Sequence, residues 1–455
     1  MKETGKQNPL GSLPVKKLLA QFAIPSIIAM LVSALYNIVD QFFIGRSVGQ
    51  LGNAATNISF PLSISCVAIA LLFGIGGASA FNLTMGAGNR EKAGYYIGNA
   101  AVMLFGCGLI LCVITQLFLS SLLKFFGSPD DVLEYAKIYT RITSFGFPFL
   151  IFATGGGHLV RADGSPRFTM ISNLSGAVVN TILDAVFVFG FGWGMAGAAF
   201  ATIIGQIVSF GLVAYYLCHY KTVKLEKKHF MVKGKYIGKI ASLGAAPCSN
   251  QLAMMVVQIV MNNSLKHYGA LSGYGESIPI ACAGIISKVN MVFFSFIIGI
   301  SQGLQPIVSF NYGAKQYGRV RKGYQTAAIY GFSISVVAFL MFQIFPRNII
   351  AAFGDGSEEY YQFATNYFRI FLFVTFLNFI QPITSNFFTA IGKPKRGIFL
   401  SLTRQIIFLL PLIVIFPRFM GIDGIMYAGP IADFMAAILG GSMIIREFRL
   451  LEYKC

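Results

Sequence analysis

Long runs of apolar residues, separated by short polar stretches, make up most of the chain. Each run has about 20 residues or more, the length that a helix needs to cross the hydrocarbon core of a bilayer. The pattern therefore predicts twelve transmembrane helices, each with boundaries uncertain by several residues. They cover Leu18–Ile44, Ala54–Phe81, Ala93–Phe118, Ala136–Val160, Phe168–Phe189, Met195–Leu217, Ile240–Leu265, Ile278–Phe310, Tyr324–Phe345, Tyr361–Ile391, Ile398–Phe416 and Ile425–Ile445.

Composition supports this interpretation. Of the 455 residues, 55% are hydrophobic and only 11% are charged, whereas about a quarter of the residues of a soluble protein are charged. The 49 glycines suit a membrane protein in which small residues let helices approach closely. We therefore expect an all-α polytopic membrane protein whose main surroundings are the lipid bilayer.

The net charge of +18 follows the predicted topology. Of the 35 Lys and Arg residues, 25 fall in the two terminal segments and in the five loops that the topology places on the same side. By the positive-inside rule, both termini are expected in the cytoplasm of a multi-pass protein. The basic surplus is thus explained by topology, and no nucleic-acid partner is expected.

Three pairs of similar segments indicate an internal repeat. The pairs are separated by 227 or 228 residues and consist of "SAFNLTMGAGN" with "PIVSFNYGAKQ", "RADGSPR" with "TAIGKPK", and "GMAGAAFAT" with "GIDGIMYAG". Each half then holds six spans, and an even number gives the two halves the same orientation, related by a pseudo-two-fold axis along the membrane normal. We predict an N-lobe at 1–218, a basic cytoplasmic linker at 219–239 and a C-lobe at 240–455.

Polar side chains inside the first-half spans converge at one depth. Asp40 lies roughly 33 Å along the first span, and Asp184 lies roughly 9 Å below the outer end of the fifth. Asn180 precedes Asp184 by one turn and shares its face, and Thr202 lies about 12 Å into the sixth span from the same side. Acids at bilayer depth are costly and usually functional, so these four residues form the predicted cation-coupling and substrate-binding site.

Two carboxylates in a poorly hydrated pocket repel each other when both are ionised, and they titrate as a coupled pair. Such a site can hold a proton, a sodium ion or an organic cation, and these compete, which is the physical basis of an antiporter. Structural roles stay open: Asp40 could cap its helix or pair with Arg46, and Asp184 could bond neighbouring helices. The residues expected to line the cavity are Tyr36, Asn37, Tyr139 and Gln206.

Other polar residues in the spans have a weaker case. His158 could carry a proton or be packed, Lys288 and Arg404 are expected to snorkel or line the aqueous cavity, and Asp433 is a candidate acid of the second half without a visible acidic partner. The sequence contains no phosphate-binding loop and no protease or esterase motif. We therefore expect no enzyme, no cofactor and no firm metal site, apart from the option of sodium at Asp40, Asn180, Asp184 and Thr202.

Several motifs together resemble the MATE (multidrug and toxic compound extrusion) family, in particular its bacterial MepA-like branch. They are "YNIVDQFFIG" at Tyr36–Gly45, "LVRADGSPR" at Leu159–Arg167, "VVNTILDAVFVFGFGWGMAGAAFAT" at Val178–Thr202 and "GISQGLQPIVSFNYGAK" at Gly299–Lys315. The resemblance implies a bacterial plasma-membrane transporter with two six-helix lobes that open as a V. It also implies multidrug efflux, and with it antibiotic resistance, by export of cationic amphipathic compounds against proton or sodium entry.

Residue by residue, the resemblance places the family's first-lobe site at Asp40, Asn180, Asp184 and Thr202. The chain departs from the family pattern at Ala185, where proline is common and where we expect a weaker kink. It also departs at Gly155–Gly157, where a polar residue is common. In the second half, Gln258, Asn262 and Asn378 occupy spans in which other branches carry cation-binding acids, so a second cation site is not expected.

The leading hypothesis is thus a monomeric cation-coupled multidrug antiporter that takes small organic cations. A lipid-linked saccharide flippase and, less favoured, an uncoupled channel are the alternatives. A flippase would need Arg or Lys in its cavity to neutralise pyrophosphate. Carboxylate, amide and hydroxyl groups serve either H⁺ or Na⁺, so both coupling ions and a range of physiological substrates stay open.

Overall fold

The structure is a computed structural model that describes the whole chain except residues 1–7, 127, 129, 275–276, 353–357 and 453–455. The described residues form helices and connecting turns, with no strand. Three of the basic residues counted for the topology, Lys2, Lys6 and Lys454, lie outside this part of the chain.

The helices of the first half follow the predicted order, with one short helix before the first span and one after the third. Their bounds are α1 Pro9–Ser12, α2 Val15–Val48, α3 Gln50–Gly86, α4 Arg90–Leu117, α5 Leu119–Phe125, α6 Asp130–Ser144, α7 Phe147–Ala162, α8 Pro166–Asp184, the π-helix η1 Ala185–Gly190 and α9 Gly194–Cys218.

A 3₁₀ turn, η2, at Lys227–Phe230 leads to the second half. The helices that follow are α10 Gly234–Ala270, α11 Ser277–Gly313, α12 Tyr317–Ile344, α13 Pro346–Ala351, α14 Glu358–Phe371, the 3₁₀ turn η3 Thr375–Leu377, α15 Ile380–Ala390, α16 Pro394–Leu402, the π-helix η4 Thr403–Leu409, α17 Leu410–Ile415, α18 Pro417–Met420 and α19 Ile422–Glu452. Since α10 begins at Gly234, the last part of the proposed linker is already helical.

The repeat proposed from the sequence is visible in where the helices begin. α3 and α11 begin at Gln50 and Ser277, and α4 and α12 begin at Arg90 and Tyr317, both 227 residues apart. α8 and α16 each have a proline as first residue, Pro166 and Pro394, 228 apart. Proline suits this position because the first helical N–H has no partner within the helix.

Ten helices of the described chain are long and apolar enough to cross a membrane. In the second half, α14 to η3 and α15 are long and apolar enough only when taken together, and they are bent by 40° where they meet. The first half has α6 and α7 in the corresponding place, separated at Phe145–Gly146, so the span predicted over Ala136–Val160 consists of two helices and not of one. Pro148 near the start of α7 has no N–H to donate to the preceding turn, which favours the break.

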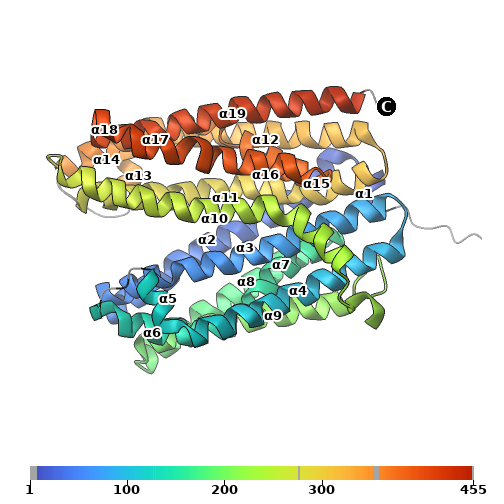
Figure 1. Cartoon of the computed structure of the whole chain (residues 1–455), viewed down its shortest axis with the longest axis horizontal. Helices are drawn as coiled ribbons and strands as arrows, with labels where there is room; N and C mark the ends of the chain where they lie inside the picture. Colours follow the sequence, from blue (N-terminus) through green and yellow to red (C-terminus); the bar gives the residue numbers. More distant parts are fainter. Residues whose placement is uncertain (1–7, 127, 129, 275–276, 353–357, 453–455) are drawn as a thin grey trace, which may run out of the picture.

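The two halves form two layers (Figure 1). The first helix of each half begins within the other half, against which its first turns pack. Leu18, Leu19 and Phe22 of α2 belong to the apolar core of the second half, whereas Ile240 and Leu243 of α10 belong to that of the first. These crossings lie toward the end of the bundle that holds α1, η2 and the C-terminal end of α19, which we call the basic end (Figure 1). The opposite end we call the far end.

Glycine lets the helices of the two halves touch backbone to backbone. A Cβ on Gly76 of α3 would lie 2.1 Å from the Ile240 carbonyl oxygen, and one on Gly244 of α10 would lie 1.8 Å from that of Leu72. In the same interface, the side-chain amide of Gln305 donates to the Ile75 carbonyl at 3.1 Å and to Ser79 Oγ at 2.8 Å. The contact between the halves is therefore close and includes buried hydrogen bonds.

Candidate functional site

Asp40 lies on α2, eight residues and roughly 12 Å before the far end of that helix. Its side chain is 9% exposed and belongs to a face that also buries Ala34 and Ile44. Arg46, the partner considered from the sequence, instead places its guanidinium over the Phe42 ring, 5.5 Å from the centroid. No ion pair in the described chain involves Asp40.

Asn180 and Asp184 occupy the last turn of α8, and both are buried, Asp184 completely. Directly after Asp184 the chain continues as the π-helix η1. The structure thus shows a π-helical segment at Ala185, where we expected a weaker kink. A π-helical segment inside a span is rare and often marks a functional site, because it changes the direction of the side chains that follow.

α9 approaches α8 closely because glycines face each other. A Cβ on Gly205 would lie 2.7 Å from the Gly176 carbonyl oxygen and 2.9 Å from the Asn180 Cβ. One turn before Gly205, Thr202 Oγ accepts a hydrogen bond from the Asn180 amide at 3.4 Å and donates to the Ala198 carbonyl at 2.9 Å. The amide of α8 and the hydroxyl of α9 are thus held together.

The structure brings the four predicted residues into one cluster. The carboxyl groups of Asp40 and Asp184 lie close enough to interact directly. The hydroxyls of Tyr36 and Tyr139 both lie near Thr202 and both interact electrostatically with the two acids. Helices α2, α6, α8 and α9 therefore contribute side chains to one polar centre inside an otherwise apolar bundle.

Among the residues that the structure describes, no basic side chain pairs with either of the two acids. Both carboxyl oxygens of Asp184 and Oδ1 of Asp40 are buried and accept no hydrogen bond from the described residues. An ionised carboxylate can only accept, so two adjacent ones cannot satisfy each other. A proton shared between them, or a bound cation, would supply the missing donor or charge.

Two other residues expected to line the cavity, Asn37 and Gln206, make their contacts away from the acid pair, and their place in a cavity stays a prediction. Asn37 is exposed, and its amide donates to the Ser33 carbonyl at 2.7 Å. Gln206, one turn beyond Thr202, lies against Gly146, where a Cβ would be 2.2 Å from the Gln206 Oε1 atom. Tyr36 and Tyr139, in contrast, interact with both Asp40 and Asp184.

An apolar cluster lies beyond Asp40 toward the far end, since its member Ile44 is one turn further along α2. It includes Ile44, Val188 and Met195, and Tyr139 packs against it. A surface cavity of about 430 Å³ is lined among others by Trp193 and again by Met195. The cluster thus contacts both the polar centre and a surface cavity.

Asp433, the candidate acid of the second half, has a different environment. Arg404 donates from Nε to Asp433 Oδ1, and the Asn378 amide donates to Oδ2 at 2.9 Å. Arg404 therefore does not snorkel, since its guanidinium is paired with a buried acid. Whether it also lines the aqueous cavity stays a prediction. With the offset of 228 that relates α16 to α8, Arg404 corresponds to Gly176, and with the offset of 227 that relates α19 to α9, Asp433 corresponds to Gln206.

The remaining candidates are placed as follows. Gln258 donates to Asn262 at 3.0 Å on an exposed stretch of α10, and Lys288 is exposed on α11. His158 is buried and Nδ1 lies 3.1 Å from a guanidinium nitrogen of Arg161, which is also buried. Gly155 has the Ala70 carbonyl 2.8 Å from its Cβ position, so the residues expected to be polar in the family serve close helix packing here.

One polar contact was missed by the sequence reasoning. Asn99 of α4 is completely buried, and its side chain forms hydrogen bonds with the backbone of the linker. The signal was available, because a strongly polar residue inside an apolar span needs a partner. The partner could not be found in the same way, since it lies 130 residues further along the chain.

The MatE family model matches residues 25–186 and 249–415, which is most of both halves. The chain belongs to the MatE family. Among curated proteins, this MatE protein is similar to the multidrug export protein MepA of Staphylococcus aureus, with 22% identity over 426 residues that cover 93% of this chain and 92% of the relative.

Solved structures agree with this assignment. The MATE multidrug transporter DinF-BH, solved as a complex, is 32% identical to the MatE protein described here, with 98% of each chain covered and a TM-score of 0.89. An outward-facing MATE family transporter of the MOP superfamily is 22% identical, with 97% and 98% coverage and a TM-score of 0.90. The predicted fold, an all-α membrane protein with twelve transmembrane helices in two six-helix lobes, is thereby confirmed.

Proposed function

We propose that this protein exports amphipathic organic cations in exchange for protons or sodium ions. The observation that carries the proposal is the acid pair Asp40 and Asp184, which is buried, close together and without a basic partner in the described chain. The two negative charges cannot both persist there without a positive guest. Binding of the coupling ion and binding of the organic cation therefore compete for one site.

The surroundings of the pair suit this exchange. Asn180 and Thr202 offer oxygen atoms that can bind a sodium ion, while the same groups can hydrogen-bond a protonated carboxyl. The relatives support multidrug export, since one is named a multidrug export protein and another a multidrug transporter. In this proposal the two lobes rock so that the pair faces each side of the membrane in turn, in a monomer whose termini both lie in the cytoplasm.

The test is uphill transport of the cationic dye ethidium in proteoliposomes that carry either a pure proton gradient or a pure sodium gradient. We expect Asp184→Asn to reduce uphill transport by about tenfold or more, because the site loses the charge that the ions compete for. Its thermal stability should be unchanged or slightly higher, since a buried acid without a partner is unfavourable. Asp423→Asn, at an exposed acid of α19, serves as the matched control.

The outcomes separate the alternatives. Uphill transport that persists in Asp184→Asn would contradict the role of the pair. Equilibration of ethidium without accumulation would instead indicate an uncoupled channel. Movement of a lipid-linked pyrophosphate but not of ethidium would indicate a flippase, although the described residues at the acid pair provide no arginine or lysine ion pair.

A further inference from the structure

The linker between the halves is fastened to the side of α4. The Asn99 amide donates to the carbonyls of His229 and Met231, both at 3.1 Å, and the Asn99 side-chain oxygen accepts from the Lys233 N–H at 2.9 Å. Asn99 lies nine residues, or roughly 14 Å, beyond the start of α4. The linker therefore folds back along the helix and does not project away from the bundle.

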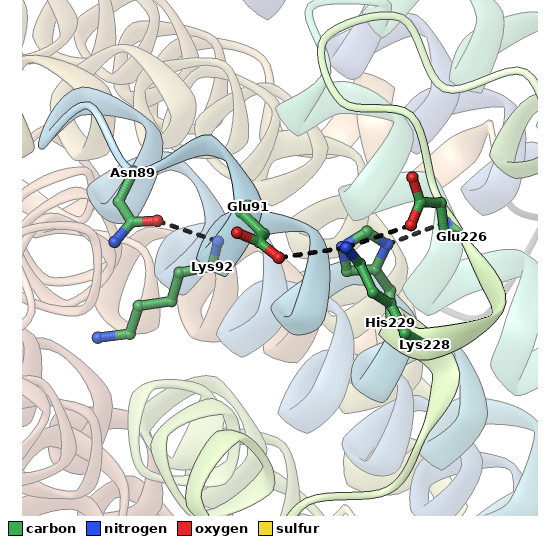
Figure 2. A network of polar contacts seen from close by, with 6 residues as sticks. All are labelled: Asn89, Glu91, Lys92, Glu226, Lys228 and His229. Carbon is green, nitrogen blue, oxygen red and sulfur yellow. Dashed lines mark hydrogen bonds and ion pairs between the residues drawn. The ribbon is translucent and has the colours of Figure 1, made fainter.

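His229 occupies a recess that two glycines provide. A Cβ on Gly94 would lie 2.9 Å from His229 Nε2, and one on Gly98 would lie 2.2 Å from the His229 carbonyl oxygen. The backbone N–H of Glu226 donates to His229 Nδ1 at 2.9 Å, and Lys228 pairs with Glu91 of α4 at 3.1 Å (Figure 2). With its histidine buried in this way, the segment that follows is held at a fixed depth.

The linker covers the face of α4 that points away from the core. α3 meets α4 at Tyr96 and Ala100, near Gly77, whereas Gly94 and Gly98 lie two residues earlier in each case, about 200° around the helix. Further along the linker side, Leu109 is 46% exposed and Val113 is 54% exposed. In a transmembrane helix such an exposed apolar stripe faces lipid, so the linker lies on the lipid-facing side.

The linker segment at Met231 lies at the depth where the hydrocarbon core of the bilayer ends. From Asn99 to the end of α4 at Leu117 the helix rises about 27 Å, close to the core thickness of about 30 Å. The linker backbone at Met231 is thus level with the place where acyl chains meet headgroups.

The side chains at this level are those of an interfacial segment. Phe230, Met231 and Val232 are 39%, 62% and 61% exposed. Lys227, Lys233 and Lys235 flank them and are all exposed. The described chain gives none of these three lysines a carboxylate partner, in contrast to Lys228. Apolar residues between lysines bind the interface of anionic membranes.

We propose that residues 227–235 form an interfacial anchor that inserts Phe230, Met231 and Val232 into the adjacent leaflet and binds anionic phospholipid headgroups through Lys227, Lys233 and Lys235. Lys233 already places its ammonium 4.4 Å from the centroid of the Tyr95 ring of α4, and its N–H groups remain able to donate to a phosphate oxygen. The anchor connects the first helix of the second half to the bilayer. It does not depend on the transported substrate.

The experiment uses the full chain in proteoliposomes. The single tryptophan is removed with Trp193→Phe, and Met231→Trp places an indole on the proposed anchor, with Val232→Trp as an independent second probe. We expect a blue-shifted emission that lipids brominated in their acyl chains quench. At equal mole fraction, brominated phosphatidylglycerol should quench about twice as strongly as brominated phosphatidylcholine, because lysines enrich anionic lipid locally.

The lysine contribution is tested by charge removal. Lys227→Gln, Lys233→Gln and Lys235→Gln together should abolish the preference for phosphatidylglycerol. The matched control removes three exposed lysines elsewhere, with Lys17→Gln, Lys322→Gln and Lys395→Gln, and should keep it. Emission at an aqueous wavelength with quenching only by iodide would overturn the insertion. Equal quenching by the two brominated lipids in the protein that keeps its lysines would contradict the proposed binding of anionic phospholipids.

Discussion

At the scale of single residues, the acids buried inside the spans have opposite surroundings in the two lobes. In the first half, Asp40 and Asp184 lie together without a basic partner in the described chain. In the second half, Asp433 is bound by its own lobe through Arg404 and Asn378. Since a paired acid has little affinity left for a guest cation, we infer that any exchange of cations takes place in the first half.

The pairing of Arg404 with Asp433 makes a stability prediction. Arg404→Met leaves a buried carboxylate uncompensated and should destabilise the protein by about 3–5 kcal/mol. Arg404→Met combined with Asp433→Leu removes both charges and should recover most of that loss. Thermal unfolding in detergent measures both variants, and a double variant as unstable as the single one would show that the pair is not what stabilises this region.

His229 makes a prediction about pH. Burial and the ammonium of Lys228 lower the pKa of His229, against the opposing charges of Glu226 and Glu91, while the Tyr95 ring packs on the imidazole. Because the folded pKa is the lower one, stability of the docked linker is fully present above about pH 6.5, the unfolded value, and is lost as the pH falls through the folded pKa.

Hydrogen exchange of residues 226–233, corrected for the intrinsic effect of pH, measures this loss. His229→Gln, which has no charge to gain, should remove the pH dependence below pH 6.5. If hydrogen exchange responds to pH equally in the unchanged protein and in His229→Gln, the titrating group is not His229.

At the scale of helices, glycine determines where α3 and α10 meet. The Cβ position of Gly244 is only 1.8 Å from a backbone oxygen of α3, and backbone cannot move aside as a side chain can. The long apolar helices supply the contact area, but the glycines, which have no side chain, determine how closely the helices approach and in which register.

Gly244→Ala should therefore force α3 and α10 apart and destabilise the protein by about 1–3 kcal/mol. Gly238→Ala lies on the same helix with nothing within 4 Å of the added methyl. It should be neutral or stabilising by up to about 1 kcal/mol. Parallel thermal unfolding of the two variants is the measurement, and equal effects would mean that the contact is not tightly packed.

At the scale of the whole molecule, the contact between the lobes includes the start of each lobe's first helix. α2 enters the core of the second half and α10 that of the first, and Gln305 bonds across the interface to Ile75 and Ser79. If the lobes rock as proposed, these buried contacts must break when the basic end opens. Their strength then sets the balance between the two states.

Gln305→Leu should shift that balance. Loss of the buried hydrogen bonds costs about 1–3 kcal/mol, which changes a two-state ratio about 5- to 150-fold. Distances between spin labels on α6 and α14, in a background without native cysteines, would report the shift as a new population. The control variant Gln362→Leu, at an exposed glutamine of the second half, should leave the distances unchanged. If Gln305→Leu shows no new population, the Gln305 hydrogen bonds do not set the balance between the two states.

The sequence alone determined the class of the molecule, the repeat and the depth of the polar residues. Apolar length reports membrane spans because the bilayer admits only helices of about 20 residues. Position along a helix reports depth because each residue rises about 1.5 Å. This is why Asp40, Asn180, Asp184 and Thr202 could be grouped before any contact was known.

Only the tertiary structure decided which side chains at one depth face one another. That depends on the rotation of each helix about its axis and on breaks within spans, which a single sequence does not specify. Thus Tyr36 meets the acids while Asn37 is exposed beside it, and Arg404 pairs with Asp433. Contacts between distant segments, such as Asn99 with the linker, form only when the packed helices bring them together.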